Sequence, residues 1–156
     1  APQAPSKYYQ GKNFKHVGAS WLTKENTLLE TENVLNYVDQ VFETEKISEA
    51  SNLIVLGYSQ GVSIATRWLA SRKINCDHLV LHSGGIPKEL TQESFAYMSA
   101  TTPVTYLYGA NDQYIDEARI TEEELKGKNL FGERLHIQVF DGIHEVNREF
   151  LWELSK

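Results

Sequence analysis

The chain has 156 residues and a mass of 17.8 kDa, a length that suits one domain. Its hydrophobic fraction of 41% excludes an intrinsically disordered chain, and no apolar run is long enough to cross a bilayer. The net charge of −6 argues against binding to nucleic-acid backbones, and the single cysteine excludes both an internal disulfide and a cysteine-based zinc site.

The first 24 residues read as an irregular segment rich in aromatic side chains. Residues 1–6 include two prolines, which fix φ and bias the preceding residues towards extended conformations, so a loop is predicted there. The sequence starts with Ala1 rather than methionine, and no basic segment followed by an apolar stretch is present. We therefore expect no signal peptide, and we expect either a flexible end or a loop that follows an earlier strand.

A first helix is predicted from Glu25 to about Lys46, because apolar residues recur there at three- and four-residue spacing. Asn26 or Thr27 is the expected N-cap, and Glu30 would interact favourably with the helix dipole near the first turn.

Short apolar runs rich in branched side chains then alternate with helical patterns. Such runs are typical of strands that are buried on both faces of a parallel sheet. The acidic run at residues 122–124 is expected to form a solvated helix face. We predict strands at 52–57, 78–82, 103–109 and 135–140, the last at an edge, and helices at 62–72, 91–99, 114–126 and 145–154.

This order predicts an α/β fold, with a parallel sheet, right-handed crossovers and helices on both faces. No linker, repeat or low-complexity stretch interrupts the chain, so residues 1–156 are expected to form a single domain.

One predicted strand-to-helix turn carries the pattern G-x-S-x-G, from Gly57 to Gly61. In this context the pattern holds its serine on a sharp, strained turn, so that the hydroxyl stands above the sheet. The glycines give room for close packing of strand and helix, and the helix N-terminus favours developing negative charge. We therefore predict that Ser59 is a nucleophile. The alternative is a glycine-rich turn with an idle serine.

A serine hydroxyl needs a base, which should be a histidine held in one tautomer by a carboxylate. In sheets of this class the acid and then the histidine follow the serine in chain order, on loops after later strands. Asp112 follows the predicted strand 103–109, and His144 follows the predicted strand 135–140. These two residues are the predicted acid and base, with Asp116 as the alternative acid.

The other histidines fit this chemistry less well. His16 lies in the N-terminal segment, His78 and His136 lie near the beginnings of strands, and His82 comes too early in chain order. We expect all four to be surface residues or satisfied polar residues. Cys76 is expected to be a small packing residue rather than a nucleophile.

Taken together, these motifs resemble the α/β-hydrolase superfamily, and specifically the carboxylesterase/phospholipase family that includes acyl-protein thioesterases. The resemblance covers nearly the whole chain. It comprises the proline-containing segment 1–5, the serine–tryptophan segment 19–22, the elbow at 56–61, the strand end at 81–85, the acid loop at 108–112 and the histidine loop at 142–145. In the acid loop, tyrosine replaces the family's histidine.

The resemblance implies a serine hydrolase that acts on carboxylic esters or thioesters without a cofactor or metal. Ser59 would attack the acyl carbonyl, His144 would carry the proton to the leaving group, and Asp112 would stabilise the imidazolium. The backbone N–H of Gln60 would donate to the oxyanion, because it directly follows the nucleophile.

The resemblance also implies that Trp21 and Leu22 line the acyl side of the site, with plain core packing as the alternative. The sequence departs from the family at the second oxyanion donor, which comes from an H-G-x-G-like loop after an earlier strand. No such segment precedes Ala1, so we expect the N-terminal strands and this loop to be missing or minimal. The chain is then either a piece of a longer protein or a minimal hydrolase whose second donor lies near residues 18–21.

The leading prediction is a short-acyl carboxylesterase or thioesterase with a small-molecule ester as substrate. One alternative is a non-catalytic hydrolase-like binding domain or fragment with an incomplete oxyanion hole, and another is an enzyme with the same triad that cleaves a peptide or a C–C bond. An exposed sheet edge would be sticky, so homodimerisation is a further hypothesis. No nucleic acid, membrane span, cofactor or metal is expected, and the lone cysteine favours a reducing compartment such as the cytoplasm.

Overall fold

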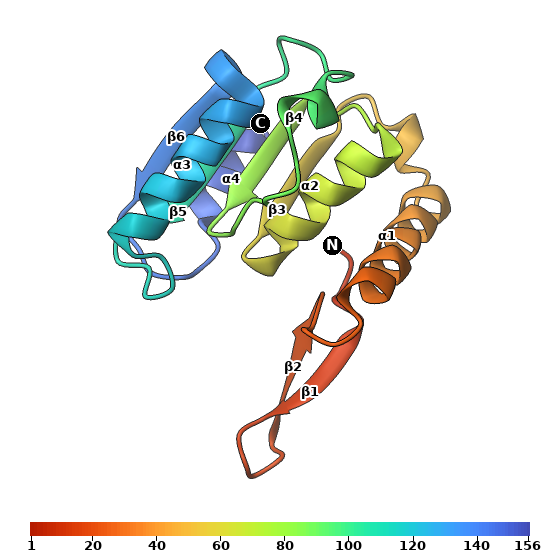
Figure 1. The fold of residues 1–156 in the computed structure, drawn as a ribbon, viewed down its shortest axis with the longest axis vertical. Helices are drawn as coiled ribbons and strands as arrows, with labels where there is room; N and C mark the ends of the chain where they lie inside the picture. Colours follow the sequence, from red (N-terminus) through yellow and green to blue (C-terminus); the bar gives the residue numbers. More distant parts are fainter. The chain divides into compact units, whose positions relative to one another are not determined.

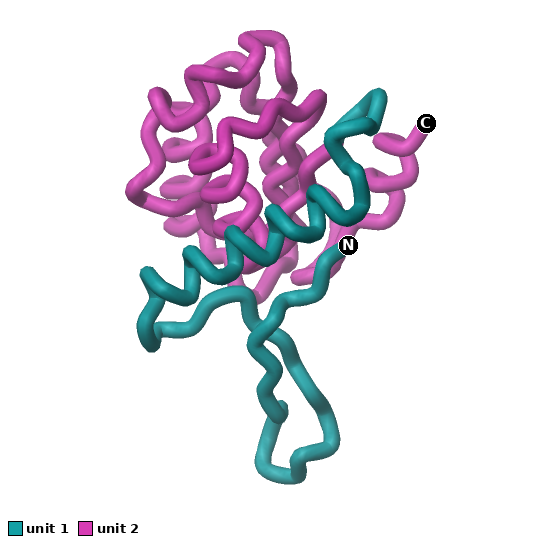
Figure 2. The backbone as a smooth tube through the Cα atoms, turned by 90° about the vertical axis from the view of Figure 1, so that its right-hand side faces the viewer, with its two compact units in different colours: residues 1–53 teal, residues 54–156 magenta.

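The computed structural model describes residues 1–156, which form two compact units. The first unit comprises residues 1–53 and the second residues 54–156, coloured teal and magenta in Figure 2. The expectation of a single domain over residues 1–156 stays a prediction.

The first unit begins with an antiparallel hairpin, so the prediction of an irregular segment over residues 1–24 is wrong in part. Strand β1 (Ser6–Gln10) pairs with β2 (His16–Ser20), and Gly11 in the connection has a φ of 74°. No residue of either strand is buried. A hairpin without a buried face shows no alternation of polar and apolar residues, which explains why the sequence pattern did not reveal it.

Helix α1 (Thr27–Thr44) follows the hairpin and is slightly shorter than predicted. Asn26 occupies the N-cap position with a left-handed φ of 51°, but its side chain makes no capping hydrogen bond. The carboxylate of Glu30 in the first turn instead accepts hydrogen bonds from the backbone N–H and the hydroxyl of Thr23. A short 3-10 helix, η1 (Ile47–Glu49), ends the unit's secondary structure.

The second unit is built on a parallel four-stranded sheet in the order β3-β4-β5-β6 (Figure 1). The predicted strands are confirmed to within two residues, and β6 lies at an edge as expected. The strands are β3 (Ile54–Tyr58), β4 (His78–His82), β5 (Val104–Gly109) and β6 (Leu135–Phe140).

The centre of the core lies along β4 and β5, where almost every residue is buried. Strand β3 lies at the other edge of the sheet, and its apolar side chains are only half-buried. The prediction that this strand is buried on both faces is therefore wrong. Homodimerisation through a sheet edge stays a prediction.

Helices cover both faces of the sheet (Figure 1). Helices α2 and α3 lie on one face, where the Tyr108 hydroxyl donates a hydrogen bond to Glu124. Helix α4 lies on the other face, where the backbone N–H of Asn147 donates to Nε2 of His82. None of the helices combines the length and the hydrophobicity that a membrane span requires. The helices are α2 (Gln60–Arg72), α3 (Glu117–Phe131) and α4 (Arg148–Leu154), with 3-10 turns η2 (Gln92–Phe95) and η3 (Gly132–Arg134).

The prediction that the acidic run 122–124 forms a solvated face is confirmed for Glu122, which is exposed, but is wrong for Glu123, which is only 4% exposed. One carboxylate oxygen of Glu123 accepts a hydrogen bond from the backbone N–H of Ile86 at 2.7 Å, and the other accepts from the ammonium of Lys126 at 2.8 Å. The ion pair and the hydrogen bond offset the free-energy cost of burying this carboxylate. The residue thereby ties α3 to the loop after β4.

Candidate active site

Ser59 lies on the turn between β3 and α2, with φ 54° and ψ −122°. A left-handed φ is strained for a residue with a side chain and persists only where the surroundings impose it. Here the Ser59 N–H donates to the carbonyl of His82 at 2.8 Å, and the Ser59 carbonyl accepts from the N–H of Val62 at 3.1 Å. The structure therefore contains the strained strand-to-helix turn that the motif predicts.

Glycines make this turn possible through close backbone contacts. A Cβ on Gly57 would lie 2.6 Å from the Gly61 carbonyl oxygen and from Cα of Val62, and a Cβ on Gly84 would overlap the Ser59 carbonyl oxygen. Strand β3, helix α2 and the loop after β4 therefore lie so close together that only glycine, which has no Cβ, fits at positions 57 and 84. The sequence pattern predicts the packing at Gly57, but the contact of Gly84 depends on the pairing of β3 with β4.

The structure brings Ser59, His144 and Asp112 together in one hydrogen-bonded chain. Nε2 of His144 lies 2.9 Å from Oγ of Ser59, and Nδ1 lies 2.7 Å from Oδ2 of Asp112. The Asp112 side chain is buried, and its other oxygen accepts the N–H of Tyr114 at 2.9 Å. A carboxylate that accepts from Nδ1–H leaves Nε2 as the acceptor for the serine hydroxyl.

Backbone contacts fix the loop that carries His144. A Cβ on Gly109 would lie 2.5 Å from the carbonyl oxygen of Gly142, so the end of β5 touches this loop directly. The Tyr58 hydroxyl donates to the His144 carbonyl at 2.9 Å. The Tyr114 ring packs edge-on against the imidazole, with centroids 4.8 Å apart. The imidazole is thus positioned by groups from three strand ends.

Asp116, the alternative acid, is the N-cap of α3, where its carboxylate accepts the N–H of Arg119 at 2.8 Å. His82 is fully buried, with Nδ1 3.0 Å from the Ser83 hydroxyl and Nε2 accepting the N–H of Asn147. Its expected role as a satisfied polar residue is confirmed. Burial, together with the neighbouring His144, lowers the pKa of His82 to about 4, so this imidazole is neutral at pH 7.

Cys76 is buried, and this burial raises the pKa of its thiol to about 11. A thiol with so high a pKa is a poor nucleophile, which agrees with the packing role that the sequence predicts. No three His, Cys, Asp or Glu side chains lie close enough together to hold a metal ion.

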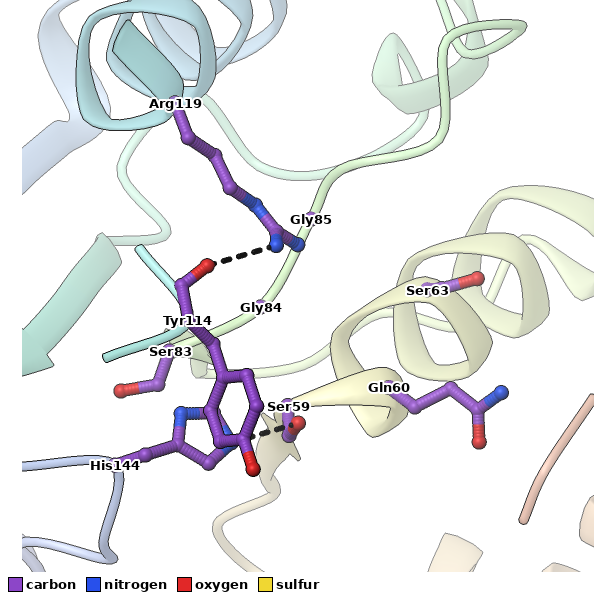
Figure 3. A pocket seen from close by; sticks show the side chains of 9 residues that line it. All are labelled: Ser59, Gln60, Ser63, Ser83, Gly84, Gly85, Tyr114, Arg119 and His144. Atoms are coloured by element: carbon purple, nitrogen blue, oxygen red, sulfur yellow. Dashed lines mark hydrogen bonds between the residues drawn. The ribbon is translucent and has the colours of Figure 1, made fainter. Parts of the chain in front are cut away.

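A pocket of about 560 Å³ opens beside Ser59 and His144. Arg119 is the only permanently charged residue in its wall (Figure 3). Sequence reasoning missed this residue, although it lies seven positions after Asp112 in the same loop and helix start. Besides Ser59, Gln60 and His144, the lining consists of Ser63, Ser83, Gly84, Gly85, Tyr114 and Arg119.

The remaining predicted site residues occupy different units. Gln60 is the first residue of α2 and lines the pocket, and its role as an oxyanion donor stays a prediction. Trp21 and Leu22 belong to the first unit, where they are half-buried after β2. The Trp21 ring lies 6.4 Å from the Tyr37 ring, and the Ser20 hydroxyl donates to the Leu22 carbonyl. Their role in substrate binding stays a prediction.

Comparisons with known proteins agree with this architecture. The model of the phospholipase/carboxylesterase family matches residues 19–156. No curated protein matches the sequence closely enough to count as a relative. Similar solved structures include Atu2452 of unknown function from Agrobacterium tumefaciens (17% identity, TM-score 0.66), the Bacillus cereus carboxylesterase (19%, 0.59) and the Zea mays acyl-protein thioesterase 2 (16%, 0.60).

At these identities the likeness establishes the fold, and it identifies the sheet and its helices as an α/β-hydrolase core. The matches cover 99%, 85% and 88% of this chain, in the same order. They cover 72%, 60% and 70% of the three solved chains, so this chain spans less than two thirds of the Bacillus cereus enzyme.

Proposed function

The chain belongs to the phospholipase/carboxylesterase family, and on that premise we propose that it is a serine hydrolase of short-acyl carboxylic esters or thioesters. The observation that carries the proposal is the hydrogen-bonded chain from Ser59 through His144 to Asp112. The likeness to a carboxylesterase and an acyl-protein thioesterase agrees with this substrate class.

Acylation begins when Oγ of Ser59 attacks the acyl carbonyl carbon and Nε2 of His144 takes the hydroxyl proton. The two atoms are already within hydrogen-bond distance, at 2.9 Å, so the proton transfer needs no rearrangement. Asp112 holds the ring in the required tautomer and stabilises the imidazolium that forms. The backbone N–H of Gln60, at the N-terminus of α2, donates to the oxyanion of the tetrahedral intermediate.

The intermediate then collapses, and the bond from the acyl carbon to the leaving oxygen or sulfur breaks. Nε2–H of His144 gives its proton to that atom, and the acyl group stays on Oγ of Ser59 as an ester. In deacylation, Nε2 takes a proton from a water molecule whose oxygen attacks the acyl carbon. The carboxylic acid leaves, the proton returns to Oγ, and the resting hydrogen bonds form again.

The preference for short acyl groups is supported by the pocket beside Ser59. Its volume is about 560 Å³, and serines, glycines and Arg119 supply much of its wall. No aliphatic side chain lines the pocket, so a long alkyl chain would find no hydrocarbon groove to pack against. A small ester with polar substituents fits this environment better.

A fluorophosphonate probe tests the proposal, because it reacts covalently only with an activated serine. Intact-mass analysis should show one label per chain in the wild type and none in Ser59→Ala. The control Ser71→Ala removes an exposed serine from α2 and should label fully. Hydrolysis of 4-nitrophenyl acetate should follow the same pattern. A folded wild-type chain that takes no label would contradict the proposal and favour a non-catalytic binding domain.

A further inference from the structure

Arg119 supplies a positive charge to the wall of the pocket beside Ser59. It extends from the first turn of α3, and its guanidinium lies near Gly85 in the loop after β4 (Figure 3). A Cβ on Gly85 would lie 3.4 Å from Nη2 of Arg119, so the guanidinium lies close to this stretch of backbone. No Asp or Glu side chain lines the pocket.

The guanidinium is positioned but not neutralised. Its Nη1 donates to the backbone carbonyl of Tyr114 at 3.0 Å, and it forms no ion pair. Glu123, one turn later on α3, is already engaged by Lys126 and by the N–H of Ile86. Arg67 provides the contrast, because its Nε pairs with Glu89 at 2.7 Å. Arg119 therefore keeps donors and charge available at the pocket.

An arginine that is oriented by one hydrogen bond and keeps its other donors available is suited to carboxylate and phosphate groups, because the planar guanidinium matches their oxygen atoms in pairs. The bond from Nη1 to the Tyr114 carbonyl reduces the rotamer freedom that a ligand would otherwise have to freeze. Within a chain of net charge −6, a pocket whose wall carries an arginine and no carboxylate offers local attraction for an anion.

We infer that this pocket selects esters that carry a second, anionic group, a carboxylate or a phosphate, which binds Arg119 while Ser59 attacks the ester carbonyl. The inference rests on the proposed hydrolase function and narrows its substrate class. Arg119 acts on the substrate's charged substituent and takes no part in the proton transfers of His144.

Two pairs of esters test the inference, each with one anionic and one neutral member. Mono-4-nitrophenyl adipate and methyl 4-nitrophenyl adipate differ in whether the far end of the acyl chain is a carboxylate or a neutral methyl ester. The compounds 4-acetoxybenzoate and methyl 4-acetoxybenzoate differ in whether the leaving phenol carries a carboxylate or a neutral methyl ester, and the ratio of their rates of alkaline hydrolysis corrects for the difference in intrinsic reactivity. In at least one pair the wild type should show a kcat/KM at least tenfold higher for the anionic member.

Arg119→Met should reduce that anionic-to-neutral ratio by tenfold or more, mainly through KM, and Arg119→Lys should keep part of it. The matched control is Lys128→Met, which removes an exposed cation near the other end of α3 and should leave the ratio as in the wild type. Stoichiometric fluorophosphonate labelling of each variant reports that its serine site is assembled.

The inference is overturned if, in both pairs, the wild type has the same kcat/KM for the neutral member as for the anionic one, whether or not the variants fold. So does a preference that Arg119→Met retains in full. Both results leave the proposed hydrolase function in place, because the esters are still cleaved. If none of the four esters is cleaved and the serine takes no label, both the proposed function and the inference are contradicted.

Discussion

Gly84 lies directly against Ser59, so that a Cβ at position 84 would overlap the Ser59 carbonyl oxygen and lie 2.5 Å from Cγ2 of Val62. The backbone of the loop after β4 is therefore in direct contact with the backbone of the candidate nucleophile. The neighbouring strand also supports the turn, because the His82 carbonyl accepts the Ser59 N–H. The strained φ of 54° at Ser59 thus depends on a strand that is remote in sequence.

Gly84→Ala should destabilise the protein and disturb the turn at Ser59. The added methyl must displace either backbone or the buried Val62, and such overpacking costs about 1–3 kcal/mol. Gly85→Ala is the matched control, since its Cβ would meet only side-chain ends, Arg119 at 3.4 Å and Glu123 at 3.5 Å. Urea denaturation measures the free energy of unfolding of both variants. Equal free energies of unfolding for the two variants would show that the contact at Gly84 is unimportant.

Asp112→Asn should lower turnover by about 10⁴-fold, as expected when an amide cannot hold the histidine in the required tautomer. The neutral amide would also leave the imidazolium without its buried counter-charge. Asp116→Asn is the control, because asparagine is as good an N-cap as aspartate. Steady-state hydrolysis of 4-nitrophenyl acetate distinguishes them. If Asp116→Asn loses activity and Asp112→Asn does not, the assignment of the acid is wrong.

The parts of the fold that the sequence predicts best are those with a strong hydrophobic period. Strands β4 and β6 have the predicted bounds, 78–82 and 135–140. The hairpin over residues 6–20 buries no face, so it left no such signal. The sequence also predicted full burial for β3, because an apolar run does not reveal that a strand lies at a sheet edge.

For the candidate site, chain order predicted the grouping of Ser59, Asp112 and His144, since parallel strands place their C-terminal ends at one edge. Arg119 could not be found in the same way. Its place in the pocket depends on where α3 starts, and α3 begins at Glu117 rather than near the predicted residue 114. A side chain's direction follows from such details of packing, which hydrophobic periodicity does not record.

Glu123→Ala should cost about 1–3 kcal/mol of stability, because it leaves the N–H of Ile86 buried without an acceptor. It also removes the carboxylate that Lys126 contacts at 2.8 Å. Glu123→Gln should cost less, since an amide oxygen can still accept the Ile86 N–H. Glu122→Ala, at the exposed neighbouring position, should change the free energy of unfolding little. Chemical denaturation at neutral pH measures all three, and equal losses at positions 122 and 123 would contradict the role of Glu123.

His82 should make the stability of the protein depend on pH. It is fully buried, and both of its ring nitrogens have hydrogen-bond partners within the fold. Burial lowers its pKa from 6.5 to about 4, and the neighbouring His144 contributes to the shift while Asp112 opposes it. Between these two values the unfolded chain binds a proton that the folded protein does not bind. The free energy of unfolding should therefore fall as the pH drops from about 6.5 to about 4, by about 3 kcal/mol at most.

The measurement is a series of urea titrations across that pH window for the wild type and for His82→Gln. Glutamine does not titrate. The slope of the unfolding free energy against pH should therefore be smaller in the variant, by an amount that corresponds to up to about one bound proton. It should also be less stable at neutral pH, because it loses the ring that packs edge-on against Tyr58 and Phe140. His16→Gln, at an exposed position on β2, is the control and should keep the wild-type slope. Identical slopes for the wild type and His82→Gln would mean that His82 titrates alike in the folded and unfolded chains.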